Sequence, residues 1–541
     1  MPAQSGNQPE LITLENWPAG GLNQTTGRST IGNEDLWWIE NFIPLSSGEL
    51  RTAWGPSEPI YTAPPGVQIL RIFFCPMNDW SRGGTSSLRA GFMFRSDGQV
   101  DQVDLDTGAV IPLGQVWQPI APVYWASLKL WRPTWIGHTV GEQGGAVIGS
   151  PQGLYAWDGQ TLTSPGEQPP LWLTNGATTD EAGDPLVMPV GLPGIYALEV
   201  YKQRLFVMGQ TVISFSGPSN GADFSASGGG GSFGYFGDQL TMSYTDLAAT
   251  AGFLYCFGDS CVDAISSIQM VGTAVASTAV PSITAPQTTE FQYQNYNPQI
   301  GQQVWRPVGE WLQAFAVFDG AGAFMLSGDG QMAWISQKLT NLWWTLDHEP
   351  FEGTIAAAHI FGQRWLLFNG TFTDPWNIKR NLMLAFNGQI WTVLTQGMTL
   401  THIGHYEQAS IIEPYGTDGT SLYKLFDQPD PKLEKRFATK AYTADNAITL
   451  KAWKRLYLQM RDIHGGPEGS FVTGDFVTAD GGIPNGAEQV SFEVQPGCAG
   501  IRPFPTIGQG ISAYLDLTSR SPDFAIERLM IAYEVRTIFG A

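Results

Sequence analysis

The side chains best suited to chemistry are few in this chain and mostly far apart. Six histidines occur among 541 residues, and the one close pair is His402 and His405, in the run His-Ile-Gly-His. An i, i+3 pair suits a metal only on a helix or a tight turn, where both rings point the same way. This segment has the pattern of strand and loop, and no cysteine lies near it. We therefore expect no metal site here.

Other catalytic signatures are missing from the sequence. It contains no GxSxG elbow, no phosphate-binding loop and no HExxH motif. The glycine-rich run at 227–232 lacks the Lys and Ser/Thr that would hold a phosphate. The sequence thus predicts a protein that is not an enzyme, with no catalytic, metal-binding or cofactor-binding residues and no cofactor.

One motif favours an alternative function. Residues 327–334 (SGDGQMAW) resemble the Asp-box of sialidases, Ser-x-Asp-x-Gly-x-Thr-Trp. They depart from it because the Gly is next to the Asp and the Thr is absent, and no site-forming arginine cluster is evident. Asp-Gly is also common in tight hairpin turns, which explains the same residues without catalysis. The alternative is a carbohydrate-binding or glycan-hydrolysing, sialidase-like propeller protein of a virion or bacterium.

Charge and cysteine usage narrow the function classes. The formal net charge is −21, from 28 basic and 49 acidic residues. An acidic surface repels phosphates and should not grip duplex DNA or an anionic membrane, although the charge could equally serve solubility alone. The four cysteines, Cys75, Cys256, Cys261 and Cys498, form no CxxC pair, which favours a reduced, structural role. The N-terminus resembles no export signal, and no apolar run is long enough to span a membrane.

Composition and local pattern predict an all-β fold. Sixty-four Gly and 36 Pro accompany 12% aromatic residues, which indicates turns between aromatic-rich strands. Within 200–225, two apolar runs flank Gly209-Gln210 and predict a hairpin followed by a cluster of turn formers. Similar hairpins are expected at 91–105, 153–162, 324–335 and 383–394, while 252–265 and 417–426 fit less well. About six or seven such units suit an irregular β-propeller, with a pair of stacked sandwiches as the rival.

Turn-forming and proline-rich stretches divide the chain into three predicted regions. Residues 1–64 are expected to form an N-terminal arm and hairpin that pack on the propeller, residues 65–426 the β-propeller, and residues 427–541 a C-terminal β-sandwich. Three long inserts in the propeller, 174–189, 227–232 and 271–299, carry little periodicity and are expected to project as loops. The last region concentrates basic charge, interpreted as a solvated strand face or as a docking patch for an acidic partner: Lys432, Lys435, Arg436, Lys440, Lys451, Lys454, Arg455 and Arg461.

Three stretches together resemble the tail nozzle proteins of short-tailed bacteriophages, also called packaged-DNA stabilisation or tail tubular proteins. Asn41-Phe42-Ile43-Pro44 followed by 47–55 resembles the hairpin that precedes the propeller in that family. Residues 204–224 resemble its strand pair ending in aromatic-Ser and an Ala-Asp-Phe turn, and 510–533 its closing sandwich strands. The chain reads Ala-Trp-Gly at 53–55, where the family often has a Pro before the Gly.

The resemblance implies a structural virion protein made in the host bacterial cytoplasm. In this family a hexameric ring forms the distal tail below the portal and adaptor, carries fibres or spikes at its side, retains packaged double-stranded DNA and gates its ejection. An acidic lumen would let DNA slide through without sequence-specific binding. We expect no membrane insertion, and we expect inserts 174–189 and 271–299 to form the gate or the contacts between subunits.

Overall fold

The computed structural model is built almost entirely from β-strands. It describes residues 10–14, 19–45, 47–79, 87–117, 127–132, 144–181, 183–192, 195, 197–209, 212–234, 244–250, 252–258, 262–272, 287–297, 309–311, 314–319, 321–327, 331–347, 355–408, 411–444, 448–464, 472–480, 483–494 and 501–538. The helices in these ranges are α1 (Leu171–Thr174), α2 (Thr340–Trp343) and a 3-10 turn at Gln337–Leu339.

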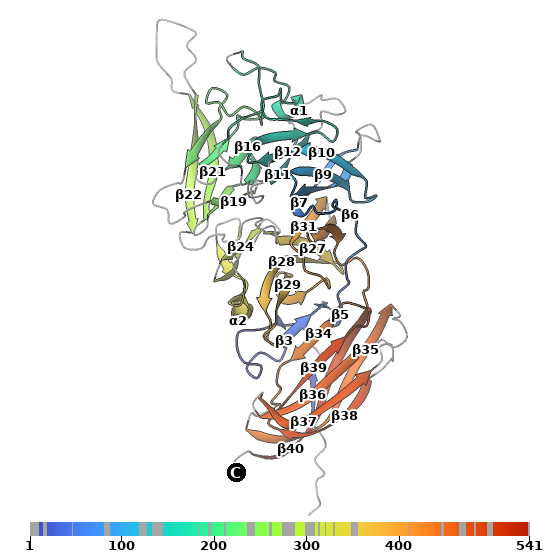
Figure 1. Ribbon diagram of the computed structural model, residues 1–541. Helices are drawn as coiled ribbons and strands as arrows, with labels where there is room; N and C mark the ends of the chain where they lie inside the picture. Colours follow the sequence, from blue (N-terminus) through green and yellow to red (C-terminus); the bar gives the residue numbers. More distant parts are fainter. Residues whose placement is uncertain are drawn as a thin grey trace, which may run out of the picture.

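Six separate four-stranded antiparallel sheets and a four-stranded part of a larger sheet, here called blades 1 to 7, form a β-propeller (Figure 1). Blade 1 contains β7 (Ile69–Asn78), β8 (Ser87–Arg95), β9 (Gln99–Asp104) and β10 (Val110–Gln115). Blade 2 contains β11 (Ser127–Trp131), β12 (Gly145–Ser150), β13 (Gly153–Trp157) and β14 (Leu162–Thr163). Blade 3 contains β15 (Ala197–Tyr201), β16 (Arg204–Met208), β17 (Val212–Phe215) and β18 (Gly231–Gly234).

The remaining blades follow the same chain order, and the last takes its fourth strand from the N-terminal region. Blade 4 contains β19 (Tyr244–Ala249), β20 (Leu254–Gly258), β21 (Val262–Gly272) and β22 (Gln287–Asn297). Blade 5 contains β23 (Gly309–Trp311), β24 (Ala314–Asp319), β25 (Gly322–Leu326) and β26 (Met332–Trp334). Blade 6 contains β27 (Ile355–Ile360), β28 (Gln363–Thr373), β29 (Lys379–Phe386) and β30 (Trp391–Leu394). Blade 7 contains β31 (His402–Gln408), β32 (Ile411–Thr417), β33 (Ser421–Lys424) and β6 (Tyr61–Thr62).

Apolar clusters between neighbouring blades hold the ring together. Phe94 of blade 1 and Ile148 of blade 2 share one cluster, and comparable clusters follow around the ring. The last cluster joins Tyr406 of blade 7 to Met93 of blade 1, which closes the circle. Side chains alternate between the two faces of a strand, so each blade contributes to the cluster on either side. A large apolar side chain buried in this way contributes about 1.5–3 kcal/mol.

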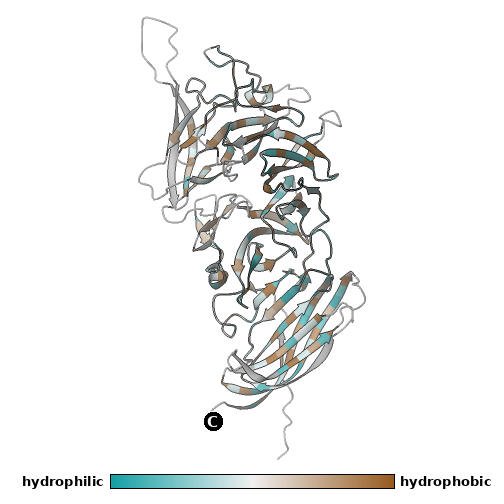
Figure 2. Cartoon of the chain, in the orientation of Figure 1, coloured by the Kyte–Doolittle hydropathy of each residue, from teal (hydrophilic) through white to brown (hydrophobic). Residues whose placement is uncertain are grey.

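The C-terminal β-sandwich lies at the other end of the elongated molecule (Figure 1). One sheet contains β38 (Ile501–Gly510), β35 (Thr449–His464), β40 (Asp523–Ile538), β5 (Leu50–Thr52) and β4 (Phe42–Pro44), with β1 (Glu10–Leu14) also paired to β40. The other contains β34 (Lys435–Thr439), β39 (Ser512–Ser519), β36 (Val472–Asp480) and β37 (Ile483–Val494). Apolar and polar colours alternate along the sandwich strands in Figure 2, as expected for strands with one buried face.

One strand joins the two domains. β3 (Asp35–Glu40) pairs with β30 of the propeller on one side and with β34 of the sandwich on the other, so a ten-stranded sheet runs through both. β2 (Gly21–Leu22) lies parallel to β3. We call residues 35–44, which cross from this sheet into the hairpin of β4 and β5, the joint segment.

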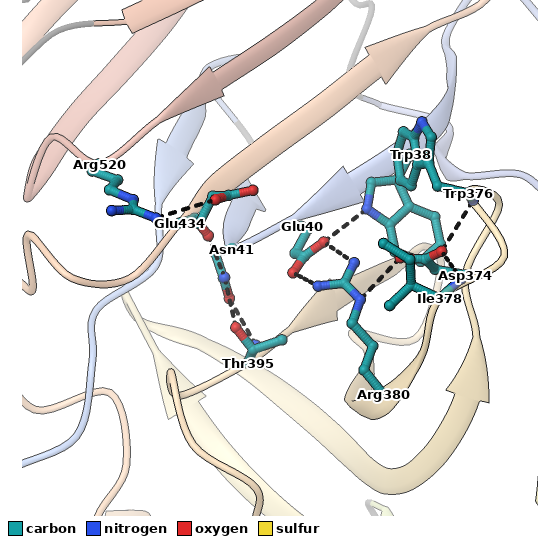
Figure 3. Close-up of polar contacts among 10 residues, drawn as sticks. All are labelled: Trp38, Glu40, Asn41, Asp374, Trp376, Ile378, Arg380, Thr395, Glu434 and Arg520. Atoms are coloured by element: carbon teal, nitrogen blue, oxygen red, sulfur yellow. Dashed lines mark hydrogen bonds and ion pairs between the residues drawn. The ribbon is translucent and has the colours of Figure 1, made fainter.

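Buried charge reinforces the joint segment (Figure 3). Arg380 on β29 donates to both carboxylate oxygens of Glu40 at 2.6 Å each, and its Nε donates to Asp374 at 3.0 Å. The indole N–H of Trp38 also donates to Glu40, at 2.9 Å. Burial alone would lower the pKa of Arg380, but the hydrogen bonds and charges of Glu40 and Asp374 outweigh it and raise the pKa.

Asn41 turns the chain between β3 and β4 and is fully buried. Its φ of 57° lies in the left-handed region, which asparagine tolerates better than most residues. Its side-chain amide donates to Thr395 Oγ1 at 2.8 Å and to the Glu434 carbonyl at 2.6 Å, while its Oδ1 accepts the Thr395 N–H at 2.7 Å (Figure 3). Asn41 therefore ties the end of a propeller blade to the start of a sandwich strand.

The all-β propeller with a C-terminal sandwich is confirmed by this topology, with seven blades. The predicted hairpin around Gly209 is the pairing of β16 with β17, and the hairpin at 153–162 is the pairing of β13 with β14. The N-terminal hairpin forms as β4 and β5. It was expected to pack on the propeller, and Ile43 and Ala53 do so, but β5 hydrogen-bonds to β40 and so belongs to a sandwich sheet.

Two expectations about the inserts were wrong. Part of 271–299 is strand β22, because Phe291 and Tyr293 alternate with polar residues as a strand requires; 273–286 and 298–299 lie outside the described residues. The run at 227–232 is not a projecting loop. It packs against the blade, where Arg204 donates to the carbonyl of Gly229 at 2.5 Å, and it ends in edge strand β18.

Candidate functional site

The first strands of six blades surround a cavity of about 510 Å³ along the propeller axis. They are β7, β11, β15, β19, β27 and β31, and Phe315 of blade 5 also contributes. A cavity of this size falls within the range of small-molecule sites, roughly 300–1,000 Å³, which are mostly apolar with a few polar groups. We take this cavity, here called the channel, as the candidate site.

A repeated sequence pattern, a charged residue beside apolar ones on the first strand of a blade, places charged side chains in the lining of the channel. Lys129 lies between two leucines on β11, Glu199 between Leu198 and a valine on β15, and Asp246 precedes Leu247 on β19. The flanking Leu198 and Leu247 enter the clusters between blades. The charged residues Lys129, Glu199 and Asp246 themselves line the cavity. Three consecutive blades thus place an ionisable group on one side of the channel.

Glu199 provides a buried carboxylate on this side of the channel. Its side chain is 9% exposed and lies 2.8 Å from the ammonium of Lys129, whose side chain is 41% exposed. Burial raises the pKa of Glu199, and the nearby charge of Asp246 adds to the effect, while Lys129 opposes it. Burial outweighs the ion pair because the partially solvated lysine is screened.

Blade 7, on the far side of the ring, contributes a second polar group. His405 Nδ1 accepts the backbone N–H of Ala357 at 3.1 Å, and its Nε2 lies 3.7 Å from Glu407. Arg364 approaches the same carboxylate at 3.9 Å. The hydrogen bond from His405, followed by the charges around it, lowers the pKa of Glu407 despite its partial burial. This side of the channel is therefore close to neutral.

The histidine pair does not converge on a metal. His402 and His405 both lie on β31, and their odd spacing places the two rings on opposite faces of the strand. Burial and the nearby charge of Arg71 lower the pKa of His402 to about 3. Within the described ranges, no group of three or more His, Cys, Asp or Glu side chains has a metal-binding arrangement.

Other residues singled out by sequence have mostly structural settings. The centre of the Asp-box-like run, 328–330, lies outside the described residues, as do Cys261 and Cys498. Cys75 and Cys256 are buried, and burial raises the pKa of Cys75 to about 12.

The basic cluster does not form one continuous solvated or docking face, because its residues differ in burial: Lys432, Arg455 and Arg461 are exposed, but others are buried. Lys435 and Lys451 are fully buried in the sandwich, because the strands that carry them have covered faces. The guanidinium of Arg436 stacks 3.2 Å from the ring centre of Trp376 at the joint. Lys454 pairs with Glu534 at 3.2 Å. The buried members of the cluster therefore lie within the sandwich and beside the joint segment, and the exposed members remain on the surface.

Comparison with known proteins does not indicate a function for this chain. No family model and no curated protein matches the chain. Among solved structures it is similar to BBS1N in complex with ARL6DN, at 10% identity over 69% of this chain and 97% of that chain, with a TM-score of 0.38. It is also similar to a chain of the mitotic checkpoint complex, at 11% identity over 69% of this chain and 94% of that chain, with a TM-score of 0.33. These similarities are too distant to indicate a function. The propeller architecture is therefore inferred from the sheet topology described above.

The helices in the described residues are three or four residues long. None of them is long and apolar enough to traverse a bilayer.

Proposed function

We propose that this chain is the nozzle subunit of a short-tailed bacteriophage tail, and that six copies form a ring that retains packaged DNA and gates its ejection. The ring would attach to an adaptor below the portal and carry fibres or spikes at its side. Each copy brings a formal charge of −21, which suits a wall that a polyanion must pass without sticking.

The observation that carries the proposal is the role of the family-like hairpin. The Asn-apolar-x-Pro run begins at Asn41, whose left-handed backbone and three side-chain hydrogen bonds tie the propeller to the sandwich. One of the three stretches that resemble the nozzle family thus lies where the propeller meets the sandwich. This specific structural role gives the resemblance more weight than a match of scattered turn residues would have.

The size of the propeller channel also constrains how the chain would work. A cavity of about 510 Å³ has the volume of a sphere roughly 10 Å across. That diameter is smaller than the width of the major groove of duplex DNA alone, roughly 12 Å, so the duplex cannot pass through it. DNA would therefore pass between copies of the chain and not through any single propeller. A closed ring with rotational symmetry is the common way for identical chains to enclose such a passage.

Insert 174–189 is the best described candidate for a contact between subunits. Leu186 and Met188 are buried, Met188 in the cluster between blades 2 and 3, while Val187 is 50% exposed and Val190, just beyond the insert, is 65% exposed. This alternation anchors the segment and presents apolar side chains outward. We assign the segment to the subunit interface in preference to a gate, because its anchored backbone is poorly suited to large movements.

Native mass spectrometry of the purified chain tests the proposal. We expect a species of six copies, and we expect Val187→Glu, within the insert, to shift the population toward the monomer. Ile111→Glu is the matched control, because Ile111 is an exposed apolar residue (39%) on the outer strand of blade 1. A chain that stays monomeric at all concentrations and hydrolyses sialylated glycans would instead support the sialidase-like alternative.

A further inference from the structure

One edge of β40 in the sandwich is covered in part by the N-terminal strand β1. β40 pairs with β35 along its length. On its other edge, among the described residues, it pairs with β5 at 525–526 and with β1 from Leu529 to Tyr533. We call residues 529–533 of β40 the acceptor edge.

Side chains as well as backbone fit β1 to the acceptor edge. Leu529 and Ile531 are fully buried, and Tyr533 is 5% exposed. Ile12 lies opposite Ile531 and packs against the same core cluster. The hydroxyl of Tyr533 donates to the Glu10 carboxylate at 2.6 Å. An uncovered strand edge is a template for pairing with another chain, so this buried stretch of β40 needs a strand in the place that β1 takes.

We propose that β1 is an exchanged strand, and that in the ring the β1 of each copy pairs with the acceptor edge of the next copy. The inference rests on the proposed function, a ring of six copies. Such a ring joins two different surfaces of neighbouring chains. A donated strand and an acceptor edge are two surfaces of this kind, and each copy has one of each. Every acceptor edge is then filled by the same contacts that form within the single chain, which makes the exchange of an identical element a low-cost route to assembly.

The position of β1 in the fold suits it for exchange. Within the part of the chain that the structure describes, β1 pairs with no strand except β40, so its transfer to a neighbour interrupts no other pairing. Four residues, 15–18, connect it to residue 19, and the last of them is Pro18. A short connection between an element and the rest of its own domain favours domain swapping.

The short connection also limits where the neighbouring copy can lie. Gly20 is fixed in its own copy, because its N–H donates to the Glu34 carbonyl at 3.0 Å and its carbonyl accepts from Lys338 at 2.9 Å. Six residues of extended chain span at most about 21 Å, so Leu14 must lie within that distance of Gly20. The exchange therefore brings the neighbour's sandwich close to the start of β2, and it adds a second contact to the one proposed for insert 174–189.

Disulfide trapping in the full chain tests the proposal. Leu11 lies opposite Ala532, and the Cα atoms of such cross-strand partners are about 4.5–5.5 Å apart, which a disulfide can span. After oxidation, the double variant Leu11→Cys/Ala532→Cys should give a ladder of linked chains, up to six, on a denaturing gel without reductant. Leu11→Cys/Arg528→Cys is the matched control. Position 528 lies on β40 about 13 Å from position 532, so this variant should give no ladder.

The outcomes separate this inference from the proposed function. If native mass spectrometry shows six copies but the oxidised Leu11→Cys/Ala532→Cys variant gives only single chains, linked internally or not linked at all, the exchange is overturned and the ring remains. If the wild-type chain forms no ring, the proposed function fails and the exchange fails with it.

A competition experiment on the wild-type chain decides if the cysteine variants do not fold. A synthetic peptide of residues 8–16, added in excess, should compete for the acceptor edge and lower the fraction of six-copy species at least twofold in native mass spectrometry. A peptide with the same residues in scrambled order is the control. A six-copy fraction that the native peptide does not lower more than the scrambled one contradicts the exchange.

Discussion

Removing Arg380, which contacts the joint segment, should destabilise the protein strongly, although this residue does not line the channel. In Arg380→Met the carboxylates of Glu40 and Asp374, whose side chains are 6% and 1% exposed, lose their common cation. Leaving a buried charge without its partner typically costs about 3–5 kcal/mol. Arg380 itself is 30% exposed, so water can partly replace it. We therefore expect a loss near the lower limit, about 3 kcal/mol in the free energy of unfolding.

The remaining hydrogen bonds also favour the lower limit. Glu40 keeps the indole N–H of Trp38 at 2.9 Å, and Asp374 keeps the backbone N–H groups of Trp376 and Ile378 at 3.0 and 2.9 Å. These donors stabilise the carboxylates without neutralising them. Combining Arg380→Met with Glu40→Gln removes one of the two unpaired charges, so the double variant should recover about 1–2 kcal/mol relative to the single variant.

Equilibrium urea unfolding at pH 7, followed by tryptophan fluorescence, measures both variants. Lys379→Met is the control on the same strand: its side chain is 61% exposed and pairs with Asp347, so it should cost less than about 1 kcal/mol. The reasoning would be refuted if Arg380→Met cost no more than Lys379→Met, or if adding Glu40→Gln made the protein still less stable.

Two further substitutions test buried features away from that site. Burial lowers the pKa of Lys435 to about 8, which makes its charge costly at neutral pH. Lys435→Met should therefore stabilise the protein at pH 7 by about 2 kcal/mol, roughly 3 from the charge less about 1 for the bond from Nζ to the Asp430 carbonyl. The gain should shrink between pH 8 and about 10.5, where the unfolded lysine loses its proton, and a pH-independent gain would contradict this explanation. Gly230→Ala should cost about 1–3 kcal/mol, because a Cβ there would meet the Phe224 backbone at 2.6–2.9 Å, whereas Gly27→Ala has open space and should cost much less in thermal unfolding.

Local sequence predicted the outer parts of the blades better than the inner ones. Asp158-Gly159 and Asn387-Gly388 are turn signals that lie between alternating strands, and both hairpins form. The first strands of most blades were not predicted, because a charged residue interrupts a short apolar run, as Lys129 does on β11. A charged residue within a short apolar run occurs again on the next blade, as Glu199. This repeat could have indicated the lining of the channel, but only if the blades were already assumed to form a ring.

Long-range pairing explains what the sequence did not reveal about the joint. β3 pairs with β30 and β34, which follow it by some 350 to 400 residues, and no local periodicity reports such partners. The burial of Lys435 and Lys451 was hidden for the same reason, since it depends on strands that cover them from elsewhere in the chain. The hairpin of β4 and β5 was predictable from its turn, but its place in a sandwich sheet was not.

Single-particle cryo-electron microscopy of the purified full chain tests the central claim most directly. The proposal predicts a closed ring of six copies, with the passage between them lined mainly by Asp and Glu and wide enough for duplex DNA. Isolated single copies in every particle class, or a ring whose passage is lined by Lys and Arg, would contradict it.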